Sequence, residues 1–202
     1  MATDKTLETY RAKRNFRRTS EPEGGKTAPA GEAPVFVIQK HQASTLHYDF
    51  RLEVDGVLKS WAVPKGPSTD PRVKRLAIPT EDHPMEYTNF EGSIPEGEYG
   101  AGTAIIWDRG TYLNLRAGKE EGAASMETSL EQGMVEIWLE GEKIRGGYAL
   151  VRTGKNENAR WLLIKMKDEQ ADARRRPTST EPRSVVSGKT LEEVAQAKGQ
   201  RA

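Results

Sequence analysis

The sequence predicts an all-β fold, mainly antiparallel, built as a small closed β-barrel of about eight strands with short peripheral helices and a basic N-terminal arm. Short runs rich in Val, Ile, Leu and aromatic residues recur from residue 35 to residue 166. Turn signals separate these runs at the spacing expected of a sandwich or barrel. A chain of 202 residues has the length of one domain plus tails, so we expect residues 35–168 to form the barrel.

The expected strands follow one another along this central region as VFVIQ, YDFRLEV, VLKSWAV, LAI, TAIIWD, MVEIWL, YALVRT and RWLLIKM. Asp55–Gly56 predicts a hairpin between the second and third runs, because glycine tolerates the positive φ of tight hairpin turns. Similar turn marks occur at Arg109–Gly110 and Glu140–Gly141. The four tryptophans all lie in strand-like runs, where core packing is favoured over base stacking: Trp61, Trp107, Trp138 and Trp161.

Both ends of the chain are polar and are expected to lie outside the barrel. Residues 1–34 are predicted to be a basic arm, with five basic residues and no acid in RAKRNFRR, on a flexible linker rich in Pro and Gly. Residues 169–202 are predicted to be a linker-like tail. Within that tail, Thr190 and Glu193 fit a capping box, so LEEVAQAK is expected to start a short helix.

Composition excludes several classes of site. The chain has no cysteine, so any metal must be held by His, Asp, Glu or water. The net charge of +1 identifies no partner. No apolar run approaches the roughly 18 residues of a membrane span, and the N-terminus has no apolar signal region. We therefore expect a soluble, cytoplasmic protein without membrane contact.

A polar row in the second expected strand is the first candidate site. His47, Asp49 and Arg51 alternate along the strand and project from one face. Three ionisable groups cannot be buried unpaired without large cost, so this face is expected at a surface or in a cavity. His41 precedes the strand by a short loop that can bring a second imidazole beside His47. Two imidazoles and one carboxylate suit Mn, Fe, Co, Ni or Zn better than Mg or Ca.

The spacing of these residues leaves a plainer alternative open, in which His41 caps a turn and His47 is a surface strand residue. Basic residues downstream favour a site, since Arg51, Lys65 and Arg75 could together form a cationic pocket for a phosphate. Taken singly, each of these cations is better explained as a solvated charge.

The third histidine, His83, lies before a proline that keeps the segment extended or turned, with Glu81 and Tyr87 in the same loop. It could act as a general acid, donate to a phosphate oxygen or hydrogen-bond the backbone, and taken alone the last role is favoured. The glycine-rich run EGSIPEGEYGAG lacks the GK[ST] ending of a nucleotide-binding loop, so it is interpreted as turns at the rim of the barrel.

The joint occurrence of FVIQKHQASTLHYDFRLEVDGVLKSWAVPKGPS, RLAIPTEDHPMEY, FEGSIPEGEYGAG and WDRGTY resembles the 3'-phosphoesterase domain of bacterial ATP-dependent DNA ligase D. The resemblance runs from about Tyr10 to Met166. It implies a Mn²⁺-dependent enzyme, with Co²⁺ or Zn²⁺ as other candidate ions, acting on 3' ends of primer-template DNA or DNA/RNA. A phosphodiesterase step would remove a terminal ribonucleoside, and a phosphomonoesterase step would remove the resulting 3'-phosphate and leave a 3'-OH.

The resemblance also assigns residues. The implied metal ligands are His41, His47 and Asp49, and the implied catalytic and phosphate-contacting set is Arg14, Glu21, Arg51, Lys65, Arg75, Glu81, His83 and Tyr87. Asn15 stands where the family usually has aspartate, which predicts weak or absent removal of a bare 3'-phosphate while diester cleavage persists.

Partners follow from the same resemblance. They are a ligase domain in the same chain or a separate ligase, together with a DNA-end-binding protein, because SVVSGKTLEEVA resembles the linker that leads to the ligase domain. The alternative function is a non-catalytic nucleic-acid-binding module that recruits end-joining partners through its basic arm.

Overall fold

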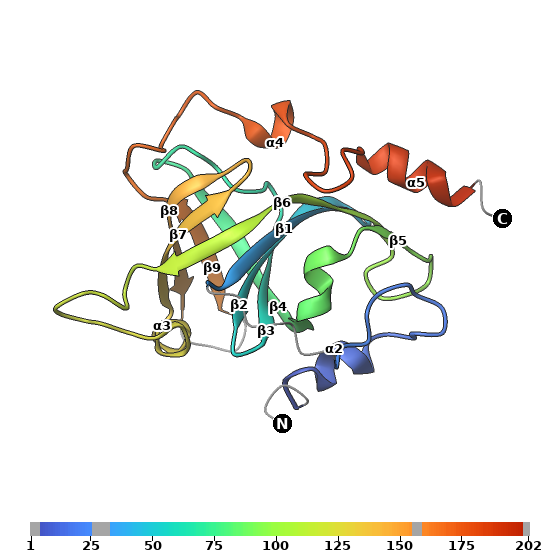
Figure 1. The fold of residues 1–202 in the computed structure, drawn as a ribbon, viewed down its shortest axis with the longest axis horizontal. Helices are drawn as coiled ribbons and strands as arrows, with labels where there is room; N and C mark the ends of the chain where they lie inside the picture. Colours follow the sequence, from blue (N-terminus) through green and yellow to red (C-terminus); the bar gives the residue numbers. More distant parts are fainter. Residues whose placement is uncertain (1–4, 26–32, 155–158, 200–202) are drawn as a thin grey trace.

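The computed structural model describes residues 5–25, 33–154 and 159–199 (Figure 1). These residues contain nine strands that belong to one antiparallel sheet. In chain order the strands are β1 (Val35–Gln42), β2 (Leu46–Val54), β3 (Val57–Val63), β4 (Lys74–Pro84), β5 (Gly92–Ile94), β6 (Gly102–Asn114), β7 (Met134–Gly141), β8 (Arg145–Thr153) and β9 (Arg160–Lys165).

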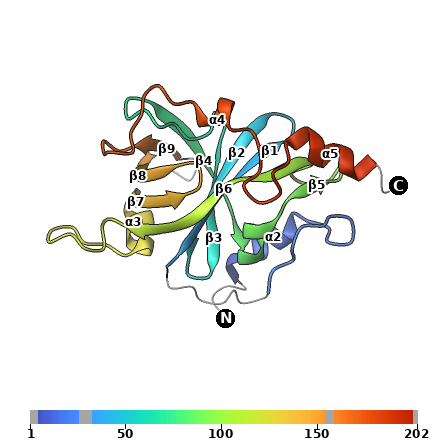
Figure 2. The same cartoon turned by 45° about the horizontal axis from the view of Figure 1, so that its top comes forward.

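The sheet closes on itself. Its strand order is β1-β2-β3-β4-β9-β8-β7-β6-β5, and an additional pairing joins β1 to β6. This pairing leaves no free edge among eight of the strands, while the short β5 pairs with one end of β6 beside the barrel (Figure 2). Short helices lie around the strands: η1 (Met85–Asn89), α2 (Glu8–Ala12), α3 (Met126–Gln132), α4 (Pro177–Thr180) and α5 (Leu191–Gly199). The predicted closed barrel of about eight antiparallel strands is confirmed.

Two of the predicted turns form and one does not. Asp55 and Gly56 have φ values of 51° and 75° and join β2 to β3 as a tight hairpin. β7 ends at Gly141, as expected from the turn mark at Glu140–Gly141. Gly110 instead lies inside β6, opposite Gly141. A Cβ atom on Gly110 would lie 1.9 Å from the carbonyl oxygen of Glu140, so this glycine permits close approach of two strands.

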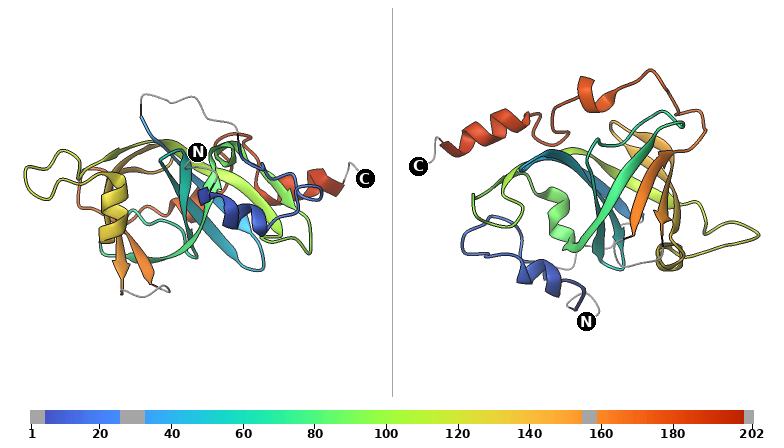
Figure 3. Two further views of the ribbon diagram at one scale, coloured as in Figure 1. Left: turned by 90° about the horizontal axis from the view of Figure 1, so that it is seen from below. Right: turned by 180° about the vertical axis from the view of Figure 1, so that it is seen from behind.

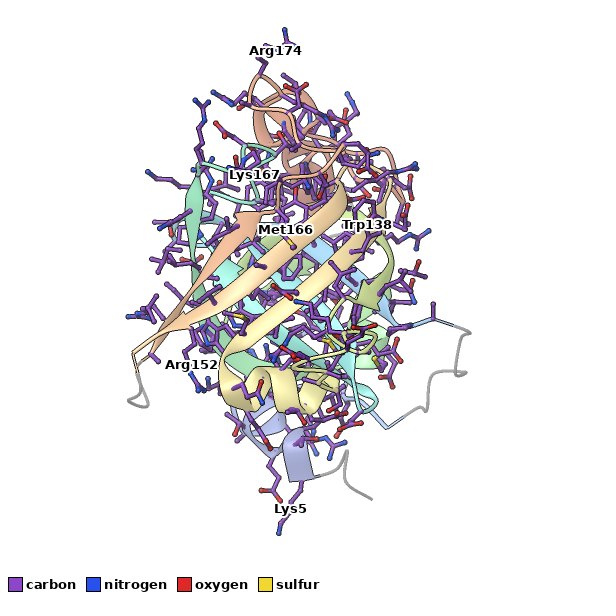
Figure 4. The ribbon with its side chains drawn as sticks, turned by 90° about the vertical axis from the view of Figure 1, so that its left-hand side faces the viewer. Lys5, Trp138, Arg152, Met166, Lys167 and Arg174 are labelled. Atoms are coloured by element: carbon purple, nitrogen blue, oxygen red, sulfur yellow. The ribbon has the colours of Figure 1, made fainter. Side chains whose placement is uncertain are left out.

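The interior of the barrel holds one apolar cluster. Phe50 packs between Phe36 and Trp61, with ring centroids 6.5 Å away in each case. Trp61, Trp107 and Trp161 are buried there, as predicted. Trp138 is not part of the cluster and lies partly exposed on the outer side of β7, the side that Figure 4 faces. Its strand position alternates with that of Leu139, which is directed inward.

The N-terminal segment packs on the outside of the barrel. Tyr10 of α2 is completely buried and donates its hydroxyl hydrogen to the carbonyl oxygen of Pro22 at 2.6 Å. Its neighbours form a second apolar cluster that includes Leu7, Leu58 and Tyr87. Residues 20–25 of the predicted linker lie against this cluster, where Pro22 accepts from Tyr10 and Glu21 accepts from Arg14 and Tyr87. Residues 26–32 of the predicted linker lie outside the described part of the chain.

The C-terminal tail also packs on the barrel, on the side opposite α2 (Figure 3). The indole nitrogen of Trp107 donates to the carbonyl oxygen of Glu181 at 2.8 Å. The amide of Val185 donates to the carbonyl oxygen of Ile106 at 3.0 Å. The predicted capping box starts α5, with the Thr190 amide 2.9 Å from the Glu193 carboxylate. None of the helices in the described part of the chain has the length and apolar character that a membrane crossing requires.

Candidate metal centre

The β1–β2 hairpin brings three potential metal ligands together on the outer face of the barrel. His41 and His47 are directly opposite each other in the antiparallel register, and Asp49 follows two residues after His47 on the same face. One carboxylate oxygen of Asp49 lies 3.4 Å from Nδ1 of His41 and 3.6 Å from Nε2 of His47. The ligand atoms of the three residues all lie within 4.8 Å of one another.

Backbone carbonyl groups orient both imidazoles. Nε2 of His41 donates to the carbonyl oxygen of Gly100 at 2.9 Å, and Nδ1 of His47 donates to that of Thr45 at 3.1 Å. In the neutral form of each ring, the nitrogen that faces Asp49 is therefore the one with a free lone pair. Metal-bound histidines are commonly held in this way, so the set fits a divalent transition metal. Sequence reasoning missed the role of Gly100, because a carbonyl group has no side-chain signature.

The charges of the ligands suit a cation. Burial opposes ionisation of Asp49 most strongly, but Arg51 and hydrogen bonds from His41 and His47 outweigh it and hold the pKa of the carboxyl well below its usual value. Burial also lowers the pKa of His47, but the neighbouring Asp49 outweighs this effect and raises that pKa. Asp49 is thus ionised at neutral pH, and His47 must lose its proton before it can bind a metal.

Arg51 lies beside the three ligands and is almost completely buried. Its Nη2 is 3.4 Å from the Asp49 carboxylate, and its Nε donates to Oε1 of Gln39 at 2.9 Å. The guanidinium group also lies over the Tyr87 ring, 4.9 Å from the centroid. Within the described residues, Nη1 of Arg51 has no hydrogen-bond partner. A buried donor left unpaired in this way is expected to meet a ligand oxygen.

The N-terminal segment contributes a second guanidinium group. Nε of Arg14 donates to the Glu21 carboxylate at 2.8 Å, and Nη1 donates to the Glu81 carboxylate at 3.0 Å. Nη2 of Arg14 lies 3.3 Å from Nε2 of His83. The predicted residues Arg14, Glu21, Glu81 and His83 therefore form one network, although Glu81 and His83 lie 67 and 69 positions after Arg14 in the sequence.

His83 and Tyr87 are both uncharged in this network. Nδ1 of His83 donates to the carbonyl oxygen of Glu81 at 2.9 Å, which leaves Nε2 to accept from Arg14. Burial, Arg51 and Arg14 all lower the pKa of His83, well below its usual value. The Tyr87 hydroxyl donates to Glu21 at 2.8 Å, and burial together with Glu21 raises its pKa well above the usual value.

A cavity of about 320 Å³ opens over these groups. Its walls include the three metal ligands, Arg51 and members of the network around Arg14, and they add two polar side chains that the sequence did not single out, Thr80 and Tyr99. The predicted residues that line the cavity are Arg14, His41, His47, Asp49, Arg51, Glu81, His83 and Tyr87.

Four further residues singled out in the sequence do not line the cavity, and one of them, Glu21, is hydrogen-bonded to the lining residues Arg14 and Tyr87. Lys65 is exposed just after β3. Arg75 shares a face of β4 with Ala77, which packs inside the barrel, whereas Thr80 is on the opposite face and lines the cavity. Strand alternation alone would have separated Arg75 from the site. Asn15 is exposed, and its side-chain oxygen accepts from the amide of Arg17 at 3.2 Å.

Comparison with known proteins bears on the chemistry of this site. The chain is 47% identical over 195 residues to the multifunctional non-homologous end joining protein LigD of Pseudomonas aeruginosa, an alignment that covers 95% of this chain and 22% of that protein. The protein of the same name from Mycolicibacterium smegmatis is 47% identical over 165 residues, which cover 81% of this chain and 21% of that protein. The multifunctional non-homologous end joining DNA repair protein LigD of Mycobacterium tuberculosis is 46% identical over 164 residues, which cover 81% of this chain and 20% of that protein.

The chain thus spans about a fifth of the length of these curated relatives. The family model described as the DNA Ligase D 3'-phosphoesterase domain matches residues 39–152. That range contains β1 from Gln39 onward, all of β2, and every cavity residue except Arg14. With the His-His-Asp group, the cavity lined by two guanidinium groups and the closed barrel in place, the chain belongs to the DNA ligase D 3'-phosphoesterase domain family.

Proposed function

We propose that the protein is a Mn²⁺-dependent phosphoesterase that processes 3' ends, with the metal held by His41, His47 and Asp49. The observation that carries the proposal is the unpaired Nη1 of Arg51 in the cavity that these three ligands line. A bound divalent metal supplies Lewis-acid polarisation of a phosphoryl oxygen. Co²⁺ and Zn²⁺ share the preference for imidazole ligands and are the other candidates.

In this proposal the protein's own cations bind and orient the phosphate. Arg51 offers the free Nη1–H group to a non-bridging oxygen, and Tyr87 and Gln39 hold its guanidinium plane in place. Arg14 adds positive charge from the N-terminal segment, while Glu21 and Glu81 fix its position. Fixed charges of this kind stabilise the charge that develops during phosphoryl transfer. Lys65 and Arg75 lie outside the cavity, so the proposal assigns them no chemical step.

His83 is proposed to respond to the substrate. Burial and two guanidinium groups keep it neutral in the free protein. A bound phosphate brings negative charge that opposes the effect of Arg14 and Arg51, so substrate binding favours protonation of His83. A protonated His83 can stabilise the pentavalent phosphorus or give its proton to the leaving oxygen. Tyr87 acts as a positioning residue, because its hydroxyl donates to Glu21 and its ring supports Arg51.

The proposed substrates are 3' ends of primer-template DNA or DNA/RNA. A diesterase step removes a terminal ribonucleoside, and a monoesterase step, weakened by Asn15, removes the remaining 3'-phosphate. The 3'-OH product is the end that a ligase needs. Proposed partners are a ligase domain in the same chain or a separate ligase, with a DNA-end-binding protein. The names of the relatives, which refer to end joining and DNA repair, support this context. The proposed location is the cytoplasm, at the nucleoid when DNA is bound.

The test is a primer-template that ends in one ribonucleotide, incubated with the protein and Mn²⁺. We expect the primer to lose its terminal nucleoside, and we expect the same from Leu113→Ala, a control at an exposed β6 residue away from the cavity. Absence of product with Mn²⁺, Co²⁺ and Zn²⁺ would rule out the proposal. A non-catalytic binding module, which the exposed basic residues Lys13, Arg17 and Arg18 favour, predicts salt-dependent binding without turnover in the same samples.

A further inference from the structure

Tyr99 differs from the other tyrosines near the metal centre in its exposure. Tyr10 and Tyr87 are buried and hydrogen-bonded, whereas Tyr99 lines the same cavity with 47% of its surface exposed. Among the large hydrophobic side chains that are exposed in the described residues, Tyr99 is the only aromatic one. An exposed aromatic ring at the mouth of a charged cavity is typical of a surface on which a planar ligand stacks.

The loop that presents Tyr99 has a defined shape. Two consecutive turns form it. The amide of Glu98 donates to the carbonyl oxygen of Pro95 at 3.2 Å, and the amide of Ala101 donates to the carbonyl oxygen of Glu98 at 3.1 Å. Gly100 has a φ of 76°, a backbone conformation that side chains disfavour. The carbonyl group of this same Gly100 orients His41. The ring of Tyr99 is thus one residue away from a group that positions a metal ligand.

The N-terminal segment fixes the other side of this loop. Nζ of Lys13 lies 3.4 Å from the Tyr99 hydroxyl and 4.7 Å from the ring centroid, and it also pairs with Glu81 at 3.0 Å. Arg18 pairs with Glu98 at 3.0 Å. A cation close to the ring places positive charge where a stacked nucleotide would carry its phosphate.

We infer that Tyr99 is the stacking platform for the base of the 3'-terminal nucleotide, an inference that rests on the proposed function and names the nucleoside subsite of the same cavity. An internal base of the primer is covered by neighbouring bases on both faces, whereas the terminal base has one face that no primer base covers. Stacking tolerates any base, because every base has a π-face. The subsite therefore recognises the presence of a terminal base and not its identity.

The experiment is a binding cycle in EDTA, which needs no turnover. Fluorescence anisotropy gives the Kd of two labelled primer-templates, one ending in an adenosine ribonucleotide and one ending in an abasic ribose. We expect the wild-type protein to bind the first about tenfold more tightly, the order of effect that base stacking on an aromatic side chain produces. Tyr99→Phe should keep this ratio, and Tyr99→Ala should bring it to within about twofold of unity. Leu113→Ala is the control for loss of an exposed apolar side chain.

Two results would overturn the inference. One is a wild-type protein that does not discriminate between the two ends or binds neither. The other is a Tyr99→Ala protein that keeps the wild-type ratio. If its affinity for both ends fell equally, Tyr99 would support the Gly100 loop and not contact the base. Parallel reactions with Mn²⁺ keep the two proposals apart. Discrimination between the two ends without cleavage would retain the stacking site and refute the catalytic proposal. Cleavage without discrimination would retain the catalytic proposal and refute the stacking site.

Discussion

The two faces of β2 meet different physical requirements. Tyr48, Phe50 and Leu52 point into the barrel and are buried by apolar neighbours from all around the sheet. His47 and Asp49 alternate with them on the outer face and need directed polar partners. The inner face requires volume and hydrophobicity, which many side chains supply. The outer face requires particular atoms at particular distances.

Those atoms come from segments that are far apart in the sequence. The loop before β6 provides the Gly100 carbonyl group, β1 provides Gln39, and the N-terminal segment provides Arg14. Substitutions on the inner face should therefore lower stability, whereas substitutions on the outer face should remove chemistry and leave the fold intact. An inner-face variant that loses chemistry while folded, or an outer-face variant that unfolds, would contradict this expectation.

The largest effect is expected from His47→Ala on the outer face. Loss of one of three metal ligands should lower Mn²⁺-dependent cleavage by at least about 10³-fold, more than the 10- to 100-fold typical of losing a partner that orients a ligand. Diester and monoester reactions should fall together. The checks are the primer assay and a calorimetric Mn²⁺ titration, with thermal unfolding to confirm the fold. Persistent cleavage would exclude His47 as an essential ligand.

The corresponding inner-face change is Phe50→Ala. This ring is almost completely buried between Phe36 and Trp61, so its removal should lower the free energy of unfolding by about 3–5 kcal/mol. Denaturant titration measures the loss, and Phe50→Leu should cost less because it leaves a smaller cavity. The folded fraction should bind Mn²⁺ with unchanged affinity. A weakened Mn²⁺ site in folded Phe50→Ala would show that the two faces of β2 are not independent.

The inner face was also the part that the sequence predicted well. Alternating apolar residues and the Asp55–Gly56 turn indicate strands and a hairpin, and the spacing of such runs indicates a barrel. The same alternation places His47, Asp49 and Arg51 on one face. The same alternation also directs Arg75 away from the cavity and Trp138 away from the core, contrary to the predictions for these two residues.

The flanking segments could not be predicted from composition. Their average polarity indicates linkers, but packing depends on a few anchors such as Tyr10 in one segment and Leu191 in the other. Arg14 shows the same limit for the site. Sequence placed it in a solvated basic arm, and only the resemblance linked it to catalysis, because its partners Glu81 and His83 are almost 70 positions away.

A titration of Mn²⁺ affinity against pH sharpens the electrostatics of the outer face. Burial lowers the pKa of His47, but Asp49 outweighs burial and raises it, so protons compete with the metal at higher pH than they would for an unperturbed imidazole. Affinity should fall up to about tenfold per pH unit below the raised pKa of His47, as expected for displacement of one proton. Asp49 adds nothing to this decline near neutrality, because its own pKa is lowered. A decline that begins only well below pH 6.5 would contradict the raised pKa.

The smallest effect is expected at Asn15, at the edge of the outer-face network. Asn15→Asp keeps the oxygen that accepts from the Arg17 amide and adds a negative charge next to Arg14 in the chain. Because the side chain is exposed and does not line the cavity, solvent screens the new charge, and the ratio of monoester to diester cleavage should rise by at most about fivefold. Matched 3'-phosphate and 3'-ribonucleotide primers measure this ratio. Wild-type protein that already cleaves both primers at equal rates would show that the residue at position 15 does not limit the monoester step. In that case Asn15→Ala, which removes the oxygen that accepts from the Arg17 amide, should slow both reactions alike.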